Sequence, residues 1–315
     1  MFYHRNLENV LFSDFSGEEI DHIVIISGYL GFQPIKKLGK LKDKKSIIIY
    51  GMYGDEGISF PLHSKIREID KELENLNILY STKPVHSKIY FGVSNGNIKF
   101  VKVGSANFSS SGLKNDEREI LVDVTPDLFD NVKHYYDWVK NNCISCQKAA
   151  YNKVPKIIQG NVVTEEKSLA YKCCLLSFLT KSKKVPSKSG LNWCHSPNGN
   201  VSKNDAYIPI RMDDIRNNPG IFPPKKQTNQ IVELIWDDGT SMDGLLEGSN
   251  NINGVIYPKQ LCSSPRKSTM GEYLRKRLNI SSSKVIDIDD LNKYGRSDVS
   301  VTLIADGVYY LDFSV

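Results

Sequence analysis

His86 and Lys88 stand two positions apart in a short apolar segment of sequence VHSKIYF. Alternate residues of a β-strand share a face, so these two side chains would point into one cleft. Gly104 permits a close backbone approach, and Asn107 would enter beside the pair as the next strand ends. An imidazole with a cation and an amide beside it is a nucleophile next to an oxyanion clamp. The spacing therefore predicts attack on a phosphodiester.

A carboxylate can orient an imidazole by hydrogen bonding to it. Residues 115–119 (NDERE), which begin a further predicted strand, contain two candidate carboxylates. Glu117 and Glu119 would lie on a common face of that strand, and either could reach the imidazole. Nothing in the whole set of candidate residues supplies a cluster of carboxylates for Mg²⁺, so we expect metal-independent chemistry without a cofactor.

The elements that position these residues follow an α/β pattern. Continuous apolar runs at residues 22–27 and 46–50 predict strands buried on both faces of a sheet. An apolar stripe predicts a helix over residues 61–76, and a Thr-Pro-Asp start predicts another from 125 to about 141. Further strands are expected at residues 78–80, 88–91, 99–103 and 119–124. We therefore expect helices packed on a mixed sheet.

The sequence changes character near residue 188, after a connector that ends in the basic stretch KSKKVPSKSG. Short strands and turn signals beyond it predict an all-β barrel or sandwich, with one amphipathic helix at residues 269–278. The strands are expected at residues 207–210, 231–236, 255–257, 285–288, 299–304 and 308–313. The chain is thus divided into an α/β domain (1–150), a connector (151–188) and an all-β domain (189–315).

Charge is distributed unevenly between these parts. The chain carries 41 Lys and Arg against 36 Asp and Glu, a net charge of +5. Residues 1–150 hold 19 of each sign, so the whole excess lies in the C-terminal half, which is where a polyanion should bind. No signal peptide and no apolar run of about 18 residues is present, so we expect a cytoplasmic protein that does not enter membranes. The six cysteines are expected to be reduced structural thiols rather than metal ligands.

The pairing of H-x-K with G-S-x-N resembles the signature of the phospholipase D superfamily over the first ~140 residues. The resemblance implies that His86 forms a phosphohistidine, with Lys88, Ser105 and Asn107 completing the site. Val93 stands where the full superfamily motif has an Asp. Compact nuclease members that lack this Asp use a Glu beyond G-S-x-N.

By its N-x-E spacing, Glu117 is favoured as the residue that orients the histidine, with Glu119 as the alternative. Superfamily active sites use two motif copies, and this chain holds one. The letters H-S-K at 63–65 and G-S-N-N at 248–251 are read as coincidence, the first because residues two apart on a helix diverge. A homodimer through the N-terminal domain would supply the second histidine as general acid.

Residues 190–315 resemble the specificity domain of phospholipase-D-type restriction endonucleases, the BfiI and NgoFVII type, which shares the pseudobarrel of plant "B-three" transcription factors. The matching segments are GLNW (190–193), AYIPI (206–210), FP (222–223), DDG (237–239), MGEYLRKRL (270–278) and YGRSDV (294–299). In that fold two loop arms grip the DNA major groove. Here they would be residues 192–205 and 263–269.

The resemblance makes the polar side chains of these arms candidate DNA contacts. Arg275 and Arg277 are either phosphate contacts or a salt-bridged helix surface, and Trp193 is either a core residue or a DNA contact. Arg296 and Asp298 are expected to form an internal pair. The full candidate set is Asn192, Trp193, His195, Lys203, Arg211, Arg266, Lys267, Ser268, Thr269, Arg275 and Arg277.

The combined features predict a type II restriction endonuclease that binds double-stranded DNA as a homodimer and cuts it without metal. Two alternatives stay open. One is a nonspecific phospholipase-D-type nuclease or phosphodiesterase, and the other is a sequence-specific DNA-binding protein with an inactive catalytic domain.

Overall fold

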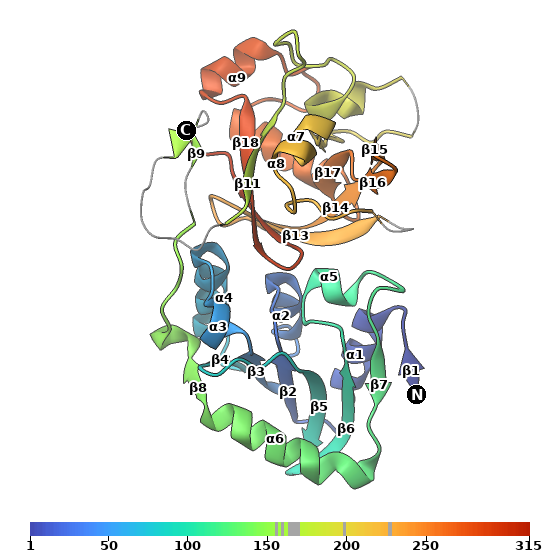
Figure 1. The fold of residues 1–315 in the computed structure, drawn as a ribbon, viewed down its shortest axis with the longest axis vertical. Coiled ribbons are helices and arrows are strands. Elements are labelled where there is room, and N and C mark those ends of the chain that lie inside the picture. Colours follow the sequence, from blue (N-terminus) through green and yellow to red (C-terminus); the bar gives the residue numbers. More distant parts are fainter. Residues whose placement is uncertain (155–156, 159–160, 163–170, 198–199, 226–228) are drawn as a thin grey trace. The chain divides into compact units, whose positions relative to one another are not determined.

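The computed structural model describes residues 1–154, 157–158, 161–162, 171–197, 200–225 and 229–315. The chain forms two compact units (Figure 1): the first holds Met1–Lys153 with Ala305–Gly307, and the second holds Val154–Ile304 with Val308–Val315. Among the helices in these ranges, none has the length and apolar character needed to cross a membrane. Residues 198–199 of the expected first arm and residues 163–170 of the expected connector lie outside the described residues.

The first unit is built on an eight-stranded mixed sheet with the strand order β1-β7-β6-β5-β2-β3-β4-β8. The central strands β2, β3 and β4 run parallel, and β5 pairs with β2 in the antiparallel sense. The apolar runs that predicted strands all lie in this sheet. Its strands are β1 (Phe2–Tyr3), β2 (His22–Ser27), β3 (Lys45–Tyr50), β4 (Leu76–Ser81), β5 (Lys88–Ser94), β6 (Asn97–Gly104), β7 (Leu121–Asp123) and β8 (Cys143–Ser145).

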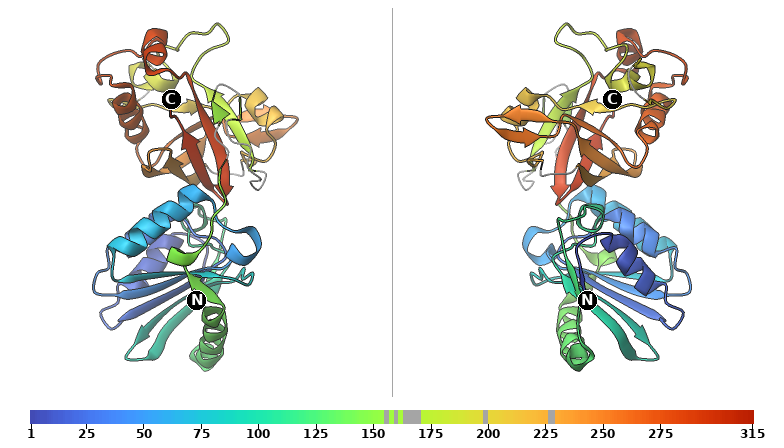
Figure 2. Two further views of the ribbon diagram at one scale, coloured as in Figure 1. Left: turned by 90° about the vertical axis from the view of Figure 1, so that its left-hand side faces the viewer. Right: turned by 90° about the vertical axis from the view of Figure 1, so that its right-hand side faces the viewer.

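Helices cover both faces of this sheet, as its buried strands require. In β2, Val24 and Ile26 pack with Val139 of α6 on one face, whereas Ile23 and Ile25 are fully buried on the other. Figures 1 and 2 show α4 and α6 on opposite faces. The helices are α1 (Leu7–Phe15), α2 (Phe32–Leu38), α3 (Tyr53–Glu56), α4 (Phe60–Glu72), α5 (Ser110–Leu113), η1 (Pro126–Leu128), α6 (Phe129–Asn141) and η2 (Cys146–Lys148).

One edge of the sheet gathers the ends of its central strands. In the strand register, Ser27 at the end of β2 lies beside Tyr50 of β3, which in turn lies beside Tyr80 of β4. Ser27 also pairs with Lys88, the first residue of the antiparallel strand β5. Ligands of open α/β sheets bind where the carboxyl ends of parallel strands meet. This edge is therefore where the predicted chemical residues come together.

The second unit is an all-β structure that curls toward a barrel. Its seven-stranded sheet has the order β11-β18-β19-β13-β14-β17-β12, and the outermost strands β11 and β12 contact each other. The strands are β11 (Cys173–Ser177), β12 (Ile208–Pro209), β13 (Gln230–Trp236), β14 (Ser241–Glu247), β17 (Gln260–Ser263), β18 (Asp298–Ala305) and β19 (Val308–Asp312). Two short ribbons accompany it, β9 (Ile157–Ile158) with β10 (Asn161–Val162), and β15 (Asn250–Ile252) with β16 (Val255–Tyr257).

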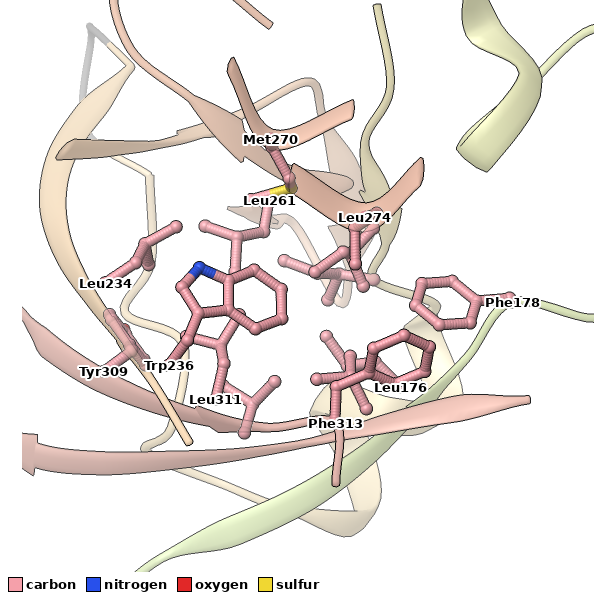
Figure 3. Close-up of a cluster of buried hydrophobic side chains, with 14 of the residues drawn as sticks. Leu176, Phe178, Leu234, Trp236, Leu261, Met270, Leu274, Tyr309, Leu311 and Phe313 are labelled. Carbon is pink, nitrogen blue, oxygen red and sulfur yellow. The ribbon is translucent and has the colours of Figure 1, made fainter. Parts of the chain in front are cut away.

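The core of this unit surrounds the fully buried indole of Trp236 (Figure 3). Leu234, Leu261 and Leu311 come from three strands of the sheet, and Leu274 comes from the helix α8. The helices in the described residues of this unit are η3 (Gly190–His195), α7 (Met212–Asn217), α8 (Ser268–Leu278) and α9 (Ile288–Tyr294). The amphipathic helix expected at 269–278 is confirmed as α8.

Two expectations for this half differ from the structure. β11 lies inside the expected connector 151–188, yet it pairs with β18 as a full strand of the second sheet. The strand expected at 285–288 is wrong, because Asp287 begins a helix there instead. Its carboxylate accepts hydrogen bonds from the backbone N–H groups of Asp289 and Asp290, each at 3.0 Å, which starts α9.

Candidate active site and nucleic-acid interface

His86 and Lys88 meet at the strand edge described above. His86 is exposed and precedes β5, whereas Lys88 begins that strand and is 7% exposed. The Lys88 Nζ atom lies 3.0 Å from each ring nitrogen of His86 and donates a 2.6 Å hydrogen bond to the His86 carbonyl oxygen. Burial lowers the pKa of the Lys88 ammonium, and the charge of Glu119 opposes that shift. The arrangement places a cation directly against an imidazole.

Asn107 joins this pair with its amide held in one orientation. Its Oδ1 atom accepts a hydrogen bond from the backbone N–H of Tyr29 at 3.1 Å, and the Ser27 hydroxyl lies 3.5 Å away. Since the amide oxygen faces a donor, the Nδ2 group is the end that can donate elsewhere. The loop behind it is tight, because a Cβ atom on Gly112 would lie 2.4 Å from the Asn107 carbonyl oxygen. Asn107 can therefore present N–H groups to an anion.

Ser105 fixes the loop that carries Asn107. Its backbone N–H donates to the carbonyl oxygen of Ile120, and its hydroxyl accepts from the Ile120 N–H, both at 3.1 Å. Gly104 makes this pairing possible, since a Cβ there would lie 2.0 Å from the Ile120 oxygen. The close backbone approach expected at Gly104 is confirmed.

Gly28 is a residue of this site that our sequence analysis missed. A Cβ atom on it would lie 2.9 Å from His86 Cδ2, 3.3 Å from Lys88 Nζ and 3.5 Å from Asn107 Oδ1. The three polar side chains thus converge on one point of the backbone. The available signal was a glycine directly after the buried strand HIVIIS, since a glycine there often marks a close approach by another group.

The two candidate carboxylates occupy different places. Residues 115–118 form a turn rather than a strand, and Glu117 adopts a left-handed backbone with φ of 61°. Its carboxylate binds His4 Nδ1 at 2.6 Å and Arg5 Nε at 2.5 Å, and these hydrogen bonds lower its pKa. The structure therefore does not bring the favoured Glu117 to the imidazole. Glu119 is the candidate whose charge acts on Lys88.

His63 of the second H-x-K sequence is a buried residue of α4, as the helical pattern predicted. Its Nδ1 atom lies 3.1 Å from the Tyr80 hydroxyl, and burial lowers the pKa of His63 to about 4. This histidine belongs to the packing beneath the sheet edge.

Two of the expected DNA contacts, Asn192 and Arg275, are interior residues of the second unit. The fully buried Asn192 amide donates to the Pro186 and Ile286 carbonyls at 2.9 and 2.7 Å and accepts from the Ile286 N–H at 2.8 Å. Arg275 is 3% exposed and donates to the carbonyl oxygens of Ser281 and Lys284. Both side chains donate to backbone carbonyl oxygens and so stabilise loops of the second unit, as buried polar groups generally do.

Arg277 and Arg211 are likewise engaged within the second unit. The Arg277 guanidinium binds both carboxylate oxygens of Asp237 at 3.1 and 3.0 Å and donates to the Tyr294 hydroxyl at 2.8 Å. Of the two readings considered for Arg277, the structure supports the salt bridge. Arg211 begins α7 and donates to the carbonyl oxygen of Leu179. The internal pair expected between Arg296 and Asp298 is confirmed at 3.0 Å.

The remaining candidates stay at or near the surface of the two arms. Lys203, Arg266 and Thr269 are exposed, and His195 and Ser268 are half-buried. Lys267 forms an ion pair with Glu247, and Trp193 packs edge-on against Tyr207 with ring centroids 5.7 Å apart. Of these side chains, Lys203 and Arg266 are the exposed cations.

The two arms come together at the start of α8. A Cβ atom on Gly271 would lie 1.7 Å from the carbonyl oxygen of Asn204, so glycine is needed where the first arm crosses the helix. The second arm is braced by the Ser263 hydroxyl, which donates to the Arg266 carbonyl oxygen at 2.6 Å and accepts from the Met270 N–H at 2.8 Å. The first arm therefore contacts the helix that directly follows the second arm.

Two family models match the chain, one in each half. The model of the NgoFVII restriction endonuclease N-terminal PLD domain matches residues 5–153, and that of the NgoFVII C-terminal B3-like DNA-binding domain matches residues 168–305. They agree with the expected fold class, a phospholipase-D-like mixed sheet followed by an all-β pseudobarrel. Together the matches span most of the chain in the expected order.

Similar solved structures cover the first half. NucT from Helicobacter pylori is 18% identical, with 46% of this chain and 97% of that chain covered and a TM-score of 0.36. Nuc from Salmonella typhimurium, a phospholipase D family member, is 13% identical, with 44% and 88% covered and a TM-score of 0.34. No curated protein sequence matches the chain.

The contacts around Gly28 predict that Gly28→Ala disables the site without unfolding the protein. The added methyl must displace the His86 ring and the Lys88 ammonium, while the backbone at position 28 needs no positive φ. A displacement of about 1 Å at a reacting group can reduce a rate on the order of 10²-fold. We expect a loss of this size in the hydrolysis of a chromogenic phosphodiester, with the melting temperature nearly unchanged.

Gly96→Ala is the matched control. Its Cβ would meet nothing within 4 Å, but the backbone there has φ of 79°, which strains an alanine. This variant should lose stability and keep the hydrolysis rate. Full activity in Gly28→Ala would show that the three side chains do not depend on the space at residue 28.

Proposed function

We propose that this chain, which belongs to the NgoFVII restriction endonuclease family, is a type II restriction endonuclease. The proposed enzyme cuts double-stranded DNA at a short specific site without a metal ion. The observation that carries the proposal is the convergence of His86, Lys88 and Asn107 on Gly28. A nucleophile beside two donors suits attack on a phosphodiester, and the same chain carries a B3-like DNA-binding domain.

In the proposed reaction, a ring nitrogen of His86 attacks the phosphorus of the scissile phosphodiester. A P–N bond forms, the P–O bond to the leaving sugar breaks, and water then hydrolyses the phosphohistidine. Lys88 Nζ and Asn107 Nδ2 donate to the non-bridging oxygens, whose charge grows in the transition state. Ser105 holds the loop of Asn107 in place, and Glu119 supplies the negative charge that balances Lys88 and orients the imidazole.

The leaving oxygen needs a proton, and we assign its donor to a second copy of the chain. The pair of H-x-K and G-S-x-N motifs occurs once, at His86 and Asn107, so each chain provides one such imidazole. A twofold homodimer through the first unit brings two His86 residues to one phosphodiester, where one attacks phosphorus and the other acts as general acid.

Sequence recognition is assigned to the two arms of the second unit. Arg266 is the leading base reader, because it is exposed on the braced second arm and a guanidinium can bind guanine through two hydrogen bonds. Lys203 on the first arm suits a phosphate contact, and Lys267 would have to leave Glu247 to make one.

Cleavage should persist in EDTA, because the proposed nucleophile is an imidazole and needs no bound metal. The measurement is a digest of unmethylated DNA with the fragment ends sequenced. Discrete ends at a common motif support the restriction enzyme, random ends indicate a nonspecific nuclease, and specific binding without cutting indicates an inactive DNA-binding protein. His86→Ala should abolish cutting and keep specific binding. Rescue of a chelated enzyme by Mg²⁺ alone would contradict the mechanism.

The shared site predicts that a dimer of one wild-type and one His86→Ala chain is inactive. The two chains can be co-expressed with different tags and the mixed dimer isolated by both. If each protomer held a complete site, this dimer would keep about half the wild-type rate. A doubly tagged wild-type dimer is the control. A protein that sediments as a monomer while cutting DNA would exclude the shared site.

Arg266→Ala should weaken binding to the cognate site by about 1–3 kcal/mol and change binding to scrambled DNA much less. Lys203→Ala should weaken both duplexes alike and reduce the salt dependence by about one phosphate contact. Titrations of both duplexes at several salt concentrations measure the difference. An equal loss on the two duplexes for Arg266→Ala would assign it to phosphate and move the base reader to another arm residue.

A further inference from the structure

Tyr29 touches both functional ends of the proposed catalytic site. Its ring lies edge-on to the imidazole of His86, with centroids 5.8 Å apart and planes at 79°. Its backbone N–H is the donor that holds Asn107 Oδ1. Edge-to-face contact is a preferred geometry of aromatic rings. One residue therefore contacts the exposed nucleophile through its side chain and the anion-binding amide through its backbone.

Buried rings behind Tyr29 hold it in place. Its centroid is 6.4 Å from that of Tyr50, and Tyr50 packs at 84° on Tyr80 with centroids 5.6 Å apart. Tyr50 and Tyr80 are buried at the ends of β3 and β4, and Tyr29 follows the end of β2. The parallel register of these strands places the three tyrosine rings next to one another. The ring that faces His86 is therefore supported by the buried core.

Two further hydrogen bonds restrain the side chain and the backbone of Tyr29. Its hydroxyl donates to Glu56 Oε1 at 2.6 Å, and its carbonyl oxygen accepts from the Ser27 hydroxyl at 2.6 Å. Burial and the Glu56 carboxylate raise the pKa of the Tyr29 phenol, so it stays a neutral donor. The Ser27 hydroxyl also accepts from the Phe108 N–H at 2.9 Å, which ties this segment to the Asn107 loop.

We propose that Tyr29 is a positioning residue of the phosphodiester-cleaving site, which holds the His86 imidazole edge-on to its ring in the orientation needed for attack. The inference rests on the proposed function, since it assigns a role within that reaction. His86 is exposed and lies before β5 begins, so strand pairing does not restrain its ring. The Tyr29 ring adds a restraint to the contact that the ring nitrogens make with Lys88. This matters because a poorly oriented nucleophile reacts more slowly even when the substrate is bound.

The test compares Tyr29→Leu, which removes the ring, with Tyr29→Phe, which keeps it. Initial rates of plasmid cleavage, measured under steady-state conditions at several plasmid concentrations, give kcat and KM for full-length protein. Tyr29→Leu should lower kcat about tenfold and leave KM unchanged, since the contact orients a nucleophile and binds no substrate. Tyr29→Phe should retain most of the activity, because the edge-on ring remains.

Tyr136→Leu is the matched control, because Tyr136 makes the same kind of contact with Phe91 at 5.5 Å and 82°, on the α6 face of the sheet. It should lower the melting temperature as much as Tyr29→Leu does and keep kcat. NMR of labelled histidine gives a second readout. The ring protons of His86 should lose the ring-current shift from Tyr29 in Tyr29→Leu and keep it in Tyr29→Phe.

Three results would overturn the role of Tyr29: wild-type kcat in Tyr29→Leu, equal kcat losses in Tyr29→Leu and Tyr136→Leu, or unchanged His86 signals in Tyr29→Leu. Failure of the proposed function looks different. In that case the wild-type protein does not cut DNA. The NMR signals of the His86 ring then still show whether Tyr29 holds the imidazole.

Discussion

The close packing of three polar side chains against Gly28 is the constraint on which the first unit depends. A Cβ atom at residue 28 would crowd His86 and Lys88 and would be in van der Waals contact with Asn107. Such proximity requires β2 to end where β5 begins, and the pairing of Ser27 with Lys88 provides this. The buried strands beneath keep that edge rigid, since Ile23 and Ile25 face one helical layer while Val24 and Ile26 face the other.

The polar groups around this edge form a support for the reactive ones. Ser27 links the end of β2 to the loop after β6 through Tyr29 and Phe108, and Ser105 links that loop to residue 120. Each bond joins segments far apart in the chain. In the proposed reaction these bonds would hold the polar groups in place before a substrate binds, which reduces the cost of reorganising them.

The positively charged side chains of the second unit fall into two groups, those paired with carboxylates and those exposed at the surface. Two of its arginines pair with carboxylates that are partly or fully buried: Arg277 with Asp237, and Arg296 with Asp298 and the buried Asp312. Removing one member of such a pair would leave a buried charge, so these residues stabilise the fold. The excess positive charge that can meet a polyanion is therefore carried by exposed cations such as Lys203 and Arg266.

Local sequence determined the strands β2 to β6, the helix α8, the H-x-K and G-S-x-N positions and the pair of Arg296 with Asp298. These features depend on the backbone period and on neighbours within a few residues, which a pattern can report. Only the tertiary structure shows that Glu117 meets His4 and Arg5, more than 100 residues earlier in the chain. It also took Asn192 into the interior, where its partner Ile286 is 94 residues away. A polar residue in a sequence does not reveal which distant partner will satisfy it, and that partner determines whether the residue faces a substrate or holds the fold together.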